Sequence, residues 1–317
     1  MKFSPFHDNV LCAATSTGSL SLWTPTYSPS RSGDLPDFSS SVPLGAEQTC
    51  HLQYFQPDVL VLSSTWHPHH PEVIGVTLSS GDIYLVKVPR EALIASPVVN
   101  LTSDLLQKIL IFSGTLEVWT LAFNPLHDEI CSGSDDSALR LHNLPHVSHM
   151  FAGDVTGVET TGFGVLSMRQ DQRIHGAGVT AILYLLDNII MTGSYDCVVR
   201  IIFIPSKGRL QVLAEANLDG GVWRLKLERS SYDVDGNSHP DEYSYDILAS
   251  CMHAGVRIVR VEKKTGGDWT IHLIAKFEEH KSMNYGSDSC FNKKPGARTV
   301  ISTSFYDALV CLWEYAS

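Results

Sequence analysis

The feature that most constrains the fold is an internal repeat that occurs six times along the chain. In each copy an apolar stretch ends in a short polar turn, and a second stretch follows with apolar residues at alternate positions. The copies are CAATSTGSLSLW (12–23), IGVTLSSGDIYLV (74–86), EICSGSDDSALRLH (129–142), IIMTGSYDCVVRII (189–202), LASCMHAGVRIV (248–259) and VISTSFYDALVCLW (300–313). A period of two places alternate side chains on one face of a sheet, so each copy predicts a β-hairpin with a buried face.

The copies align on one turn position. It is filled by Thr17, Ser80, Asp136, Asp196, His253 and Asp307. Neighbouring copies are between 54 (253 to 307) and 63 (17 to 80) residues apart. Apolar residues follow three and five positions later, and we expect these pairs to pack inward. The pairs are Leu20 and Leu22, Ile83 and Leu85, Leu139 and Leu141, Val199 and Ile201, Val256 and Ile258, and Val310 and Leu312.

A second apolar motif precedes most of the turns, and it often carries tryptophan. The instances are STWHP (64–68), VWTLAFNP (118–125), GVTAILYL (178–185) and GVWRLKLE (221–228). One unit therefore holds about four short strands, as in a propeller blade. The sequence predicts an all-β WD-repeat β-propeller with six recognisable repeats, room for a seventh blade, and an incomplete first blade. We expect one domain over residues 1–317, with polar inserted loops near 24–49, 145–173 and 229–246.

Composition narrows the possible functions. The net charge of −11 argues against non-specific nucleic-acid binding, which needs a basic surface. Seven cysteines without a C-x-x-C pair argue against a disulfide framework or a thiolate zinc site, and favour a reducing compartment. The N-terminus lacks the apolar region of a signal peptide, and the longest apolar run, 181–191, is too short to span a membrane. We expect a cytoplasmic monomer that binds neither nucleic acid nor membrane.

His253 occupies a turn position that carries aspartate in three other copies. An aspartate at such a turn typically accepts hydrogen bonds from the loop backbone, and an imidazole can also cap a turn. Histidine is equally the usual general base near neutral pH. We expect His175 and His280 to be buried scaffold residues. The WHPHHPE segment (66–72) looks metal-like, but its prolines favour an extended loop, so no metal site is predicted.

The DGGVWR segment (219–224) precedes one repeat, and it combines flexible backbone with an aromatic side chain and a cation. Gly220 and Gly221 allow either a close approach of the backbone or a positive φ, and Arg224 is expected to face away from Trp223. The signatures G-x-S-x-G, G-x-x-x-x-G-K-[ST] and G-x-G-x-x-G are absent from the sequence. Without such an enzyme signature, the repeat pattern by itself is typical of a protein that binds other proteins.

An ordered series of motifs does indicate more. The series GSYD (193–196), GGVWR (220–224), CMHAG (251–255), HKSMNYGSD (280–288) and SFYD (304–307), with the opening FSPFHDNVLCAATSTGSLSLW and EVWTLAFNPLHDEICSGSDDSALRLHNL, resembles the diphthine methyl ester hydrolase family of WD-repeat proteins. The resemblance covers nearly the whole chain. It implies hydrolysis of the methyl ester of methylated diphthine on elongation factor 2, with release of methanol and without a cofactor. Departures from the family pattern are Ser289 after Asp288, Gly176 after His175, and few residues before Phe3.

Our own assignment of roles starts from the ester. Hydrolysis needs an activated water and donors for the oxyanion. We expect His253 to be the base, oriented by Asp196 or Asp288, and Arg224 or the N–H groups of Gly220 and Gly221 to hold the oxyanion. Trp223, Tyr285 and Tyr306 are expected to bind the trimethylammonium group of the substrate through cation–π attraction.

The alternative is a non-catalytic adaptor that binds a protein partner through loops such as 229–246. An adaptor should show a flat exposed apolar patch. An esterase should show a pocket holding His253 with an acid nearby.

Overall fold

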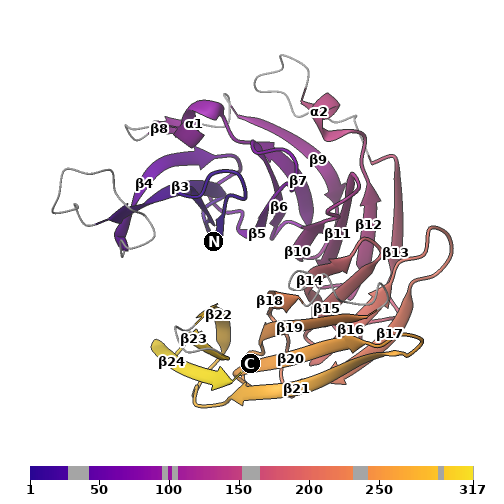
Figure 1. Cartoon of the computed structure of the whole chain (residues 1–317). Coiled ribbons are helices and arrows are strands. Elements are labelled where there is room, and N and C mark those ends of the chain that lie inside the picture. The colour runs from indigo at the N-terminus through magenta and orange to yellow at the C-terminus, as the bar shows by residue number, and fades with distance from the viewer. Residues whose placement is uncertain are drawn as a thin grey trace. The chain divides into compact units, whose positions relative to one another are not determined.

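The computed structural model describes residues 1–27, 43–94, 99–101, 106–151, 165–230, 242–291 and 296–316. These residues form six sheets that follow one another along the chain (Figure 1). The first sheet has the order β1-β2-β3-β4-β8, the second β5-β6-β7-β9 and the third β10-β11-β12-β13. Their strands are β1 (Lys2–Phe3), β2 (Leu11–Ala14), β3 (Ser19–Tyr27), β4 (Pro43–Gln53), β8 (Val99–Leu101), β5 (Val61–Trp66), β6 (Val73–Leu78), β7 (Asp82–Lys87), β9 (Gln107–Ser113), β10 (Val118–Phe123), β11 (Glu129–Ser134), β12 (Leu139–Asn143) and β13 (Ser167–Asp171).

The fourth sheet has the order β14-β15-β16-β17, the fifth β18-β19-β20-β21 and the sixth β22-β23-β24. Their strands are β14 (Val179–Leu186), β15 (Ile189–Ser194), β16 (Val198–Phe203), β17 (Gln211–Asn217), β18 (Arg224–Ser230), β19 (Tyr243–Ser250), β20 (Val256–Lys263), β21 (Trp269–Phe277), β22 (Asn284–Phe291), β23 (Ala297–Ser304) and β24 (Leu309–Ala316). The two short helices are α1 (Arg90–Ile94) and α2 (Val147–Met150). No helix in the described ranges is both long and apolar enough to span a membrane.

Each of the six predicted hairpins is present as two antiparallel strands, for example β15 and β16, in which Met191 pairs with Ile201. Together with neighbouring strands these hairpins make sheets of three to five strands, four of them four-stranded, as is typical of the blades of a WD-repeat β-propeller. The first sheet was expected to be incomplete, but it has five strands, of which β1 is only two residues long. A parallel fifth strand, β8, extends the first sheet on its other side.

The chain divides into two compact units. One comprises Met1–Phe123, His127–Ile130 and His142–Met168, and the other comprises Asn124–Leu126, Cys131–Leu141 and Arg169–Ser317. The boundary between the two units passes within the third sheet. The single domain expected over residues 1–317 therefore stays a prediction. Of the expected inserted loops, 24–49 is shorter than predicted, because β3 continues to Tyr27 and β4 begins at Pro43. The central parts of all three inserts lie outside the described residues.

The core of each unit lies between consecutive sheets. In the second unit, one cluster joins the fourth and fifth sheets through residues such as Ile201, Val222 and Ile247. A smaller cluster joins the fifth and sixth sheets around Ile258 and Val300. Gly220 lies at a close approach between the sheets, where an added Cβ would meet the Cys251 carbonyl oxygen at 2.3 Å. The predicted close approach of the backbone at this glycine is confirmed.

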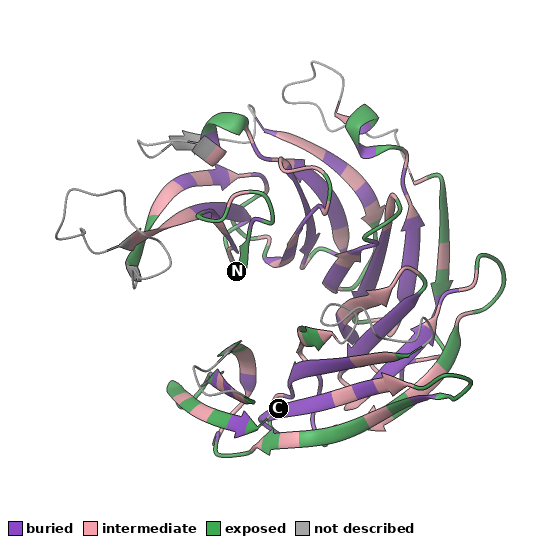
Figure 2. Cartoon of the chain, viewed as in Figure 1, coloured by how far each residue is buried: buried purple, intermediate pink, exposed green. Residues whose placement is uncertain are grey.

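The inward packing of the predicted apolar pairs holds in five copies and fails in the last. Leu20, Leu22 and their counterparts through Ile258 are buried, whereas Val310 is 62% and Leu312 73% exposed. Leu139 and Leu141 show what such a pair normally contacts, since they pack against Val179 and Ile190 of the next sheet. β24 is the last described strand, and no further sheet follows it along the described chain. Figure 2 accordingly colours most of β24 as exposed or intermediate.

Candidate functional site

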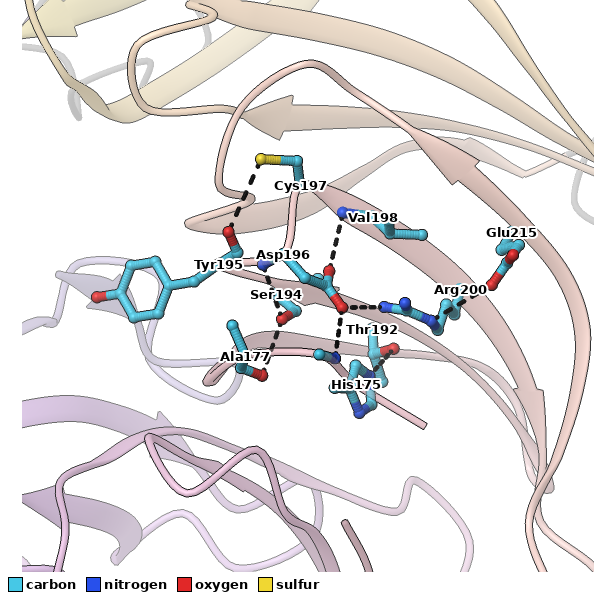
Figure 3. A network of polar contacts seen from close by, with 12 residues as sticks. His175, Ala177, Thr192, Ser194, Tyr195, Asp196, Cys197, Val198, Arg200 and Glu215 are labelled. Carbon is cyan, nitrogen blue, oxygen red and sulfur yellow. Dashed lines mark hydrogen bonds and ion pairs between the residues drawn. The ribbon is translucent and has the colours of Figure 1, made fainter. Parts of the chain in front are cut away.

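The turn between β15 and β16 shows what an aspartate does at the repeat position. The Asp196 carboxylate accepts hydrogen bonds from the N–H groups of Gly176 (2.8 Å) and Val198 (3.0 Å) and forms an ion pair with Arg200 at 2.8 Å (Figure 3). Beside it, buried His175 shares a 2.9 Å hydrogen bond with Thr192. This network ties the turn to the segment before β14, as the scaffold interpretation of His175 expects.

Asp136 repeats the arrangement in the third sheet, where it accepts from the Ala138 N–H at 3.0 Å and pairs with Arg140. Burial by itself raises the pKa of Asp196, but the donors of Gly176 and Val198 and the charge of Arg200 outweigh it and hold that pKa below its usual value. A lowered carboxylate pKa in the folded state adds stability at neutral pH.

Replacing Asp196 by asparagine should therefore remove a pH-dependent part of the stability. The contribution is present above the unfolded pKa of about 3.9 and is lost as the pH falls through the lower folded pKa. We expect a loss of about 1.5–3 kcal/mol at pH 7, typical of hydrogen bonds to a charged group, and a smaller difference from the parent protein near pH 3. Urea unfolding at both pH values measures it; an equal difference at both would contradict the linkage.

His253 occupies the corresponding position in the turn between β19 and β20. The Ala254 N–H donates to the Cys251 carbonyl at 2.8 Å, just as the Cys197 N–H donates to Ser194 at 3.2 Å. The left-handed residue that follows is displaced by one position, to Gly255 with φ 79°, whereas Cys197 has φ 68°. The imidazole is exposed, and within the described ranges it forms no hydrogen bond or ion pair. His253 therefore does not form the turn hydrogen bonds and the ion pair that Asp196 forms in its copy.

The arginine of this copy shows how the scaffold compensates. Arg257 is four residues after His253, as Arg200 is four residues after Asp196. Its guanidinium is buried and turns to other partners, namely the Ala254 carbonyl at 2.6 Å and the Glu278 carboxylate at 2.7 Å. Glu278 thus supplies the negative charge that the turn lacks, which leaves His253 free for another role.

His253 lines a hollow of about 360 Å³ in the second unit. The other lining residues are His280, Lys281, Ser282, Met283 and Tyr306. His280 is buried and hydrogen-bonded to Ser302 at 2.8 Å, which agrees with its predicted scaffold role. The turn of His253 reaches the hollow because the Asn284 N–H, at the start of β22, donates to the Met252 carbonyl at 2.9 Å.

An aromatic row runs along the same end of the fourth, fifth and sixth sheets. It consists of Tyr195, Trp223, Tyr285, Phe305 and Tyr306, whose successive ring centroids are 6.0, 5.2, 5.9 and 5.1 Å apart. The three predicted aromatic residues, Trp223, Tyr285 and Tyr306, are thus brought together. Tyr306, 75% exposed, lies in this row and also lines the hollow with His253. Burial is the main cause that raises the pKa of Tyr285, so its hydroxyl stays protonated at neutral pH.

Arg224 lies against Trp223, with its guanidinium carbon 4.8 Å from the ring centroid, rather than facing away from it as expected. Its Nη1 donates to the carbonyls of Trp223 (2.9 Å) and Thr180 (3.4 Å). Burial lowers the pKa of this guanidinium, and no carboxylate in the described part of the chain pairs with it. A half-buried arginine without a counter-ion is suited to an anionic ligand group.

The two acids predicted to orient His253 lie elsewhere. Asp196 is committed to its own turn, and Asp288 pairs with Lys226. Asp288 is four residues along β22 from Asn284, which at about 3.3 Å per residue is roughly 13 Å farther along the strand. A direct hydrogen bond to His253 is out of reach over that distance, so the expected orientation by Asp288 is corrected.

Several residues of the site were not anticipated from the sequence. Tyr195 and Phe305 belong to the aromatic row, and their neighbours in GSYD and SFYD were the signal that pointed toward them. Ser282 carries no such signal. Its Oγ accepts hydrogen bonds from the N–H groups of Met283 (2.6 Å) and Tyr306 (3.0 Å), and so it holds the turn of Tyr306 over the hollow.

An aspartate lies close to two histidines of the WHPHHPE segment, which the sequence did not indicate. Ligand atoms of His67, His70 and Asp128 lie within 4.8 Å of one another in the first unit. However, His67 Nδ1 accepts from the N–H groups of His69 (3.0 Å) and His70 (3.2 Å), so the neutral ring carries its proton on Nε2. A metal-bound histidine instead donates a proton from its second nitrogen. These contacts disfavour metal binding by His67, and the absence of a metal site stays a prediction.

Comparison with known proteins gives the relationship of the chain. A family model described as "WD domain, G-beta repeat" matches residues 106–143. The curated "Diphthine methyltransferase" of Saccharomyces cerevisiae is 28% identical over 353 aligned residues, which cover 99% of this chain and 82% of that protein. The chain is therefore similar to a curated diphthine methyltransferase along nearly its whole length. This similarity confirms the resemblance found from the motifs.

Other diphthine methyltransferases align over shorter stretches. The Schizosaccharomyces pombe protein is 27% identical, with 80% of this chain and 78% of that protein covered. The Homo sapiens protein is 29% identical, with 60% of this chain and 36% of that protein covered. Among solved structures, the "Crystal Structure of Mitotic Checkpoint Complex" contains a chain with a TM-score of 0.55 and 13% identity that covers all of this chain. At that identity the likeness shows the fold alone.

Proposed function

We propose that the protein hydrolyses the methyl ester of methylated diphthine on elongation factor 2 and releases methanol and diphthine. The observation that carries the proposal is the position of His253. Its imidazole is exposed in a hollow of about 360 Å³ next to an aromatic row, whereas Asp196 at the same repeat position is half-buried and bonded to its own turn. The names of the relatives support a role in diphthine chemistry.

The reaction balances with groups that the site offers. His253 accepts a proton from water as the water oxygen bonds to the ester carbonyl carbon, and it returns the proton to the departing methoxide. Arg224, which lacks a carboxylate partner within the described residues, is the proposed cation that holds the developing oxyanion. The N–H groups of Gly220 and Gly221 remain proposed donors for the same oxyanion. No cofactor is required by this scheme.

The aromatic row supplies the recognition of the trimethylammonium group. Arg224 already covers part of the Trp223 ring, so we propose that the exposed ring of Tyr306 and the half-buried ring of Tyr285 accept the substrate cation. Phe305, 67% exposed, extends the same surface. We propose the methylated form of elongation factor 2 as the partner, bound by a monomer in the cytoplasm.

A direct test follows the mass of the substrate. Elongation factor 2 carrying methylated diphthine is incubated with the protein, and the modified peptide is analysed by mass spectrometry together with the released methanol. Loss of one methyl group with stoichiometric methanol supports hydrolysis. Methyl loss without methanol, or an unchanged peptide, contradicts it.

Replacing Tyr306 by leucine should weaken substrate binding more than the chemical step. The ring contributes cation–π attraction, of about 0.5–2 kcal/mol, to the bound cation. We expect KM to rise roughly 3- to 30-fold at little-changed kcat. His272→Ala, on the exposed surface of β21, is the control and should change neither constant. A fall in kcat alone in the leucine variant would refute the proposed binding role.

One observation favours the adaptor alternative. Ile301, Val310 and Leu312 expose a continuous apolar face on β23 and β24. Such a face is typical of a surface that contacts another protein. Binding of modified elongation factor 2 without any methyl loss in the assay above would support the adaptor over the esterase.

A further inference from the structure

A small hollow in the second unit lies apart from the site described above. Its lining comes mainly from β13 and from the 204–210 connection between β16 and β17, and its volume is about 80 Å³. Its lining residues are Leu141, Arg169, Gln170, Asp171, Arg173, Gly208, Arg209 and Leu210. We call it the arginine hollow.

The charges around the arginine hollow are unbalanced. Three guanidinium groups, of Arg169, Arg173 and Arg209, surround it, and Asp171 is the only carboxylate in its lining. Asp171 is already engaged by Arg173, whose Nη2 and Nε lie 2.6 and 3.2 Å from its two oxygens. Two positive charges are therefore left over, in a chain whose net charge is −11.

Two of these arginines are available to a ligand in different ways. Arg169 is held in place through Nη1, which donates to the Pro205 carbonyl at 2.7 Å and leaves its other donors for a ligand. Arg209 is exposed and forms no hydrogen bond or ion pair within the described ranges. The nearby Lys207, on the same connection, adds a further positive charge.

The apolar side of the arginine hollow strengthens the attraction between its arginines and an anion. Leu141 is buried and Leu210 half-buried, so one side of the hollow is apolar and excludes water. Electrostatic attraction is stronger beside such a surface than in bulk water. Gly208, with φ 93° and open space where a Cβ would stand, lets the connection turn so that Arg209 reaches the hollow.

We propose that the arginine hollow binds a phosphate group. Guanidinium groups hold phosphate oxygens through paired N–H donors, and arginines on separate elements can approach a tetrahedral anion from several sides. A planar carboxylate would use only one of these pairs. The phosphate can be free or carried on a phosphorylated side chain, and these two sources present the same group to the hollow.

The test uses the full chain and inorganic phosphate as the probe. Line broadening of the ³¹P signal is followed as protein is added, at constant ionic strength maintained with sodium chloride. We expect saturable broadening that sodium sulfate reverses by competition. Arg209→Ala and Arg169→Ala should each weaken phosphate binding about tenfold, because each removes hydrogen bonds to a charged group.

Arg229→Ala is the matched control, since Arg229 is an exposed arginine on β18 in the same unit. It should leave the broadening unchanged, and circular dichroism confirms that every variant is folded. A parallel titration with phosphoserine identifies the source: similar affinity indicates free phosphate, and tighter binding indicates a phosphorylated side chain. Broadening that is absent, that the two hollow variants retain, or that Arg229→Ala also loses, overturns the proposal.

Discussion

Replacing His253 by alanine should reduce the rate of methyl loss from methylated diphthine by about 10²- to 10⁴-fold, the usual contribution of a general base. The reason is that His253 is the exposed histidine of the hollow, while its neighbour His280 is buried and hydrogen-bonded to Ser302. Since Arg257 already has Glu278 as a partner, the substitution leaves no buried charge behind. We therefore expect the melting temperature to stay close to that of the parent protein.

The measurement compares initial rates from methanol release and from the peptide mass. His272→Ala is the matched control, because His272 is an exposed histidine on β21 outside the hollow. Its rate should equal that of the parent. If His253→Ala also turned over at the parent rate while folded, His253 would not be the base. The methyl-loss assay on the parent protein would still decide the proposed function separately.

The repeat could be predicted from the sequence because each copy has apolar residues at alternate positions around an aligned turn. The hairpin pairs from Leu20 and Leu22 to Val256 and Ile258 are buried as the period of two predicted. The same rule failed for Val310 and Leu312, because alternation tells which side chains share a face but not whether a further sheet covers that face. Burial of a sheet depends on a neighbour that local sequence does not specify.

The candidate site was predicted in part for a similar reason. Equivalent turns lie at the same end of their sheets, so Trp223, Tyr285 and Tyr306 could be expected to meet, and they do. The partners of individual charges could not be read in this way. Asp288 was expected beside His253, but Lys226 on the neighbouring strand holds it, and that pairing depends on the register between sheets.

The fifth copy, in which histidine replaces aspartate at the turn, shows best what the sequence alone does not predict. The alignment correctly placed His253 at the position of Asp196, as the shared turn hydrogen bonds show. It did not reveal that Glu278, a residue outside the repeat motif, takes over the pairing with the buried arginine. The turn of the fifth copy can lack the aspartate because another carboxylate pairs with the buried arginine. That carboxylate lies outside the repeat motif, so the alignment of the repeats does not identify it.

The largest expected effect on stability comes from a buried ion pair between the fifth and sixth sheets. Glu228 on β18 and Arg298 on β23 are almost fully buried and 2.8 Å apart, and Arg298 also donates to the Glu228 carbonyl. Burial is the main cause that raises the pKa of Glu228, against the lowering effect of Lys226 and Arg298. Glu228→Ala should lower the free energy of unfolding by about 3–5 kcal/mol, because it breaks a buried ion pair by removing one of its two members.

Urea unfolding followed by tryptophan fluorescence measures this loss, and Glu279→Ala, at an exposed glutamate, should change the unfolding free energy by less than about 0.5 kcal/mol. The double variant Glu228→Leu, Arg298→Met separates a lost charge partner from lost packing. Because the cost arises from removing only one member of a buried pair, replacing both members by apolar side chains should restore most of the stability. A double variant as unstable as Glu228→Ala would instead mean that the two side chains join the sheets mainly through shape.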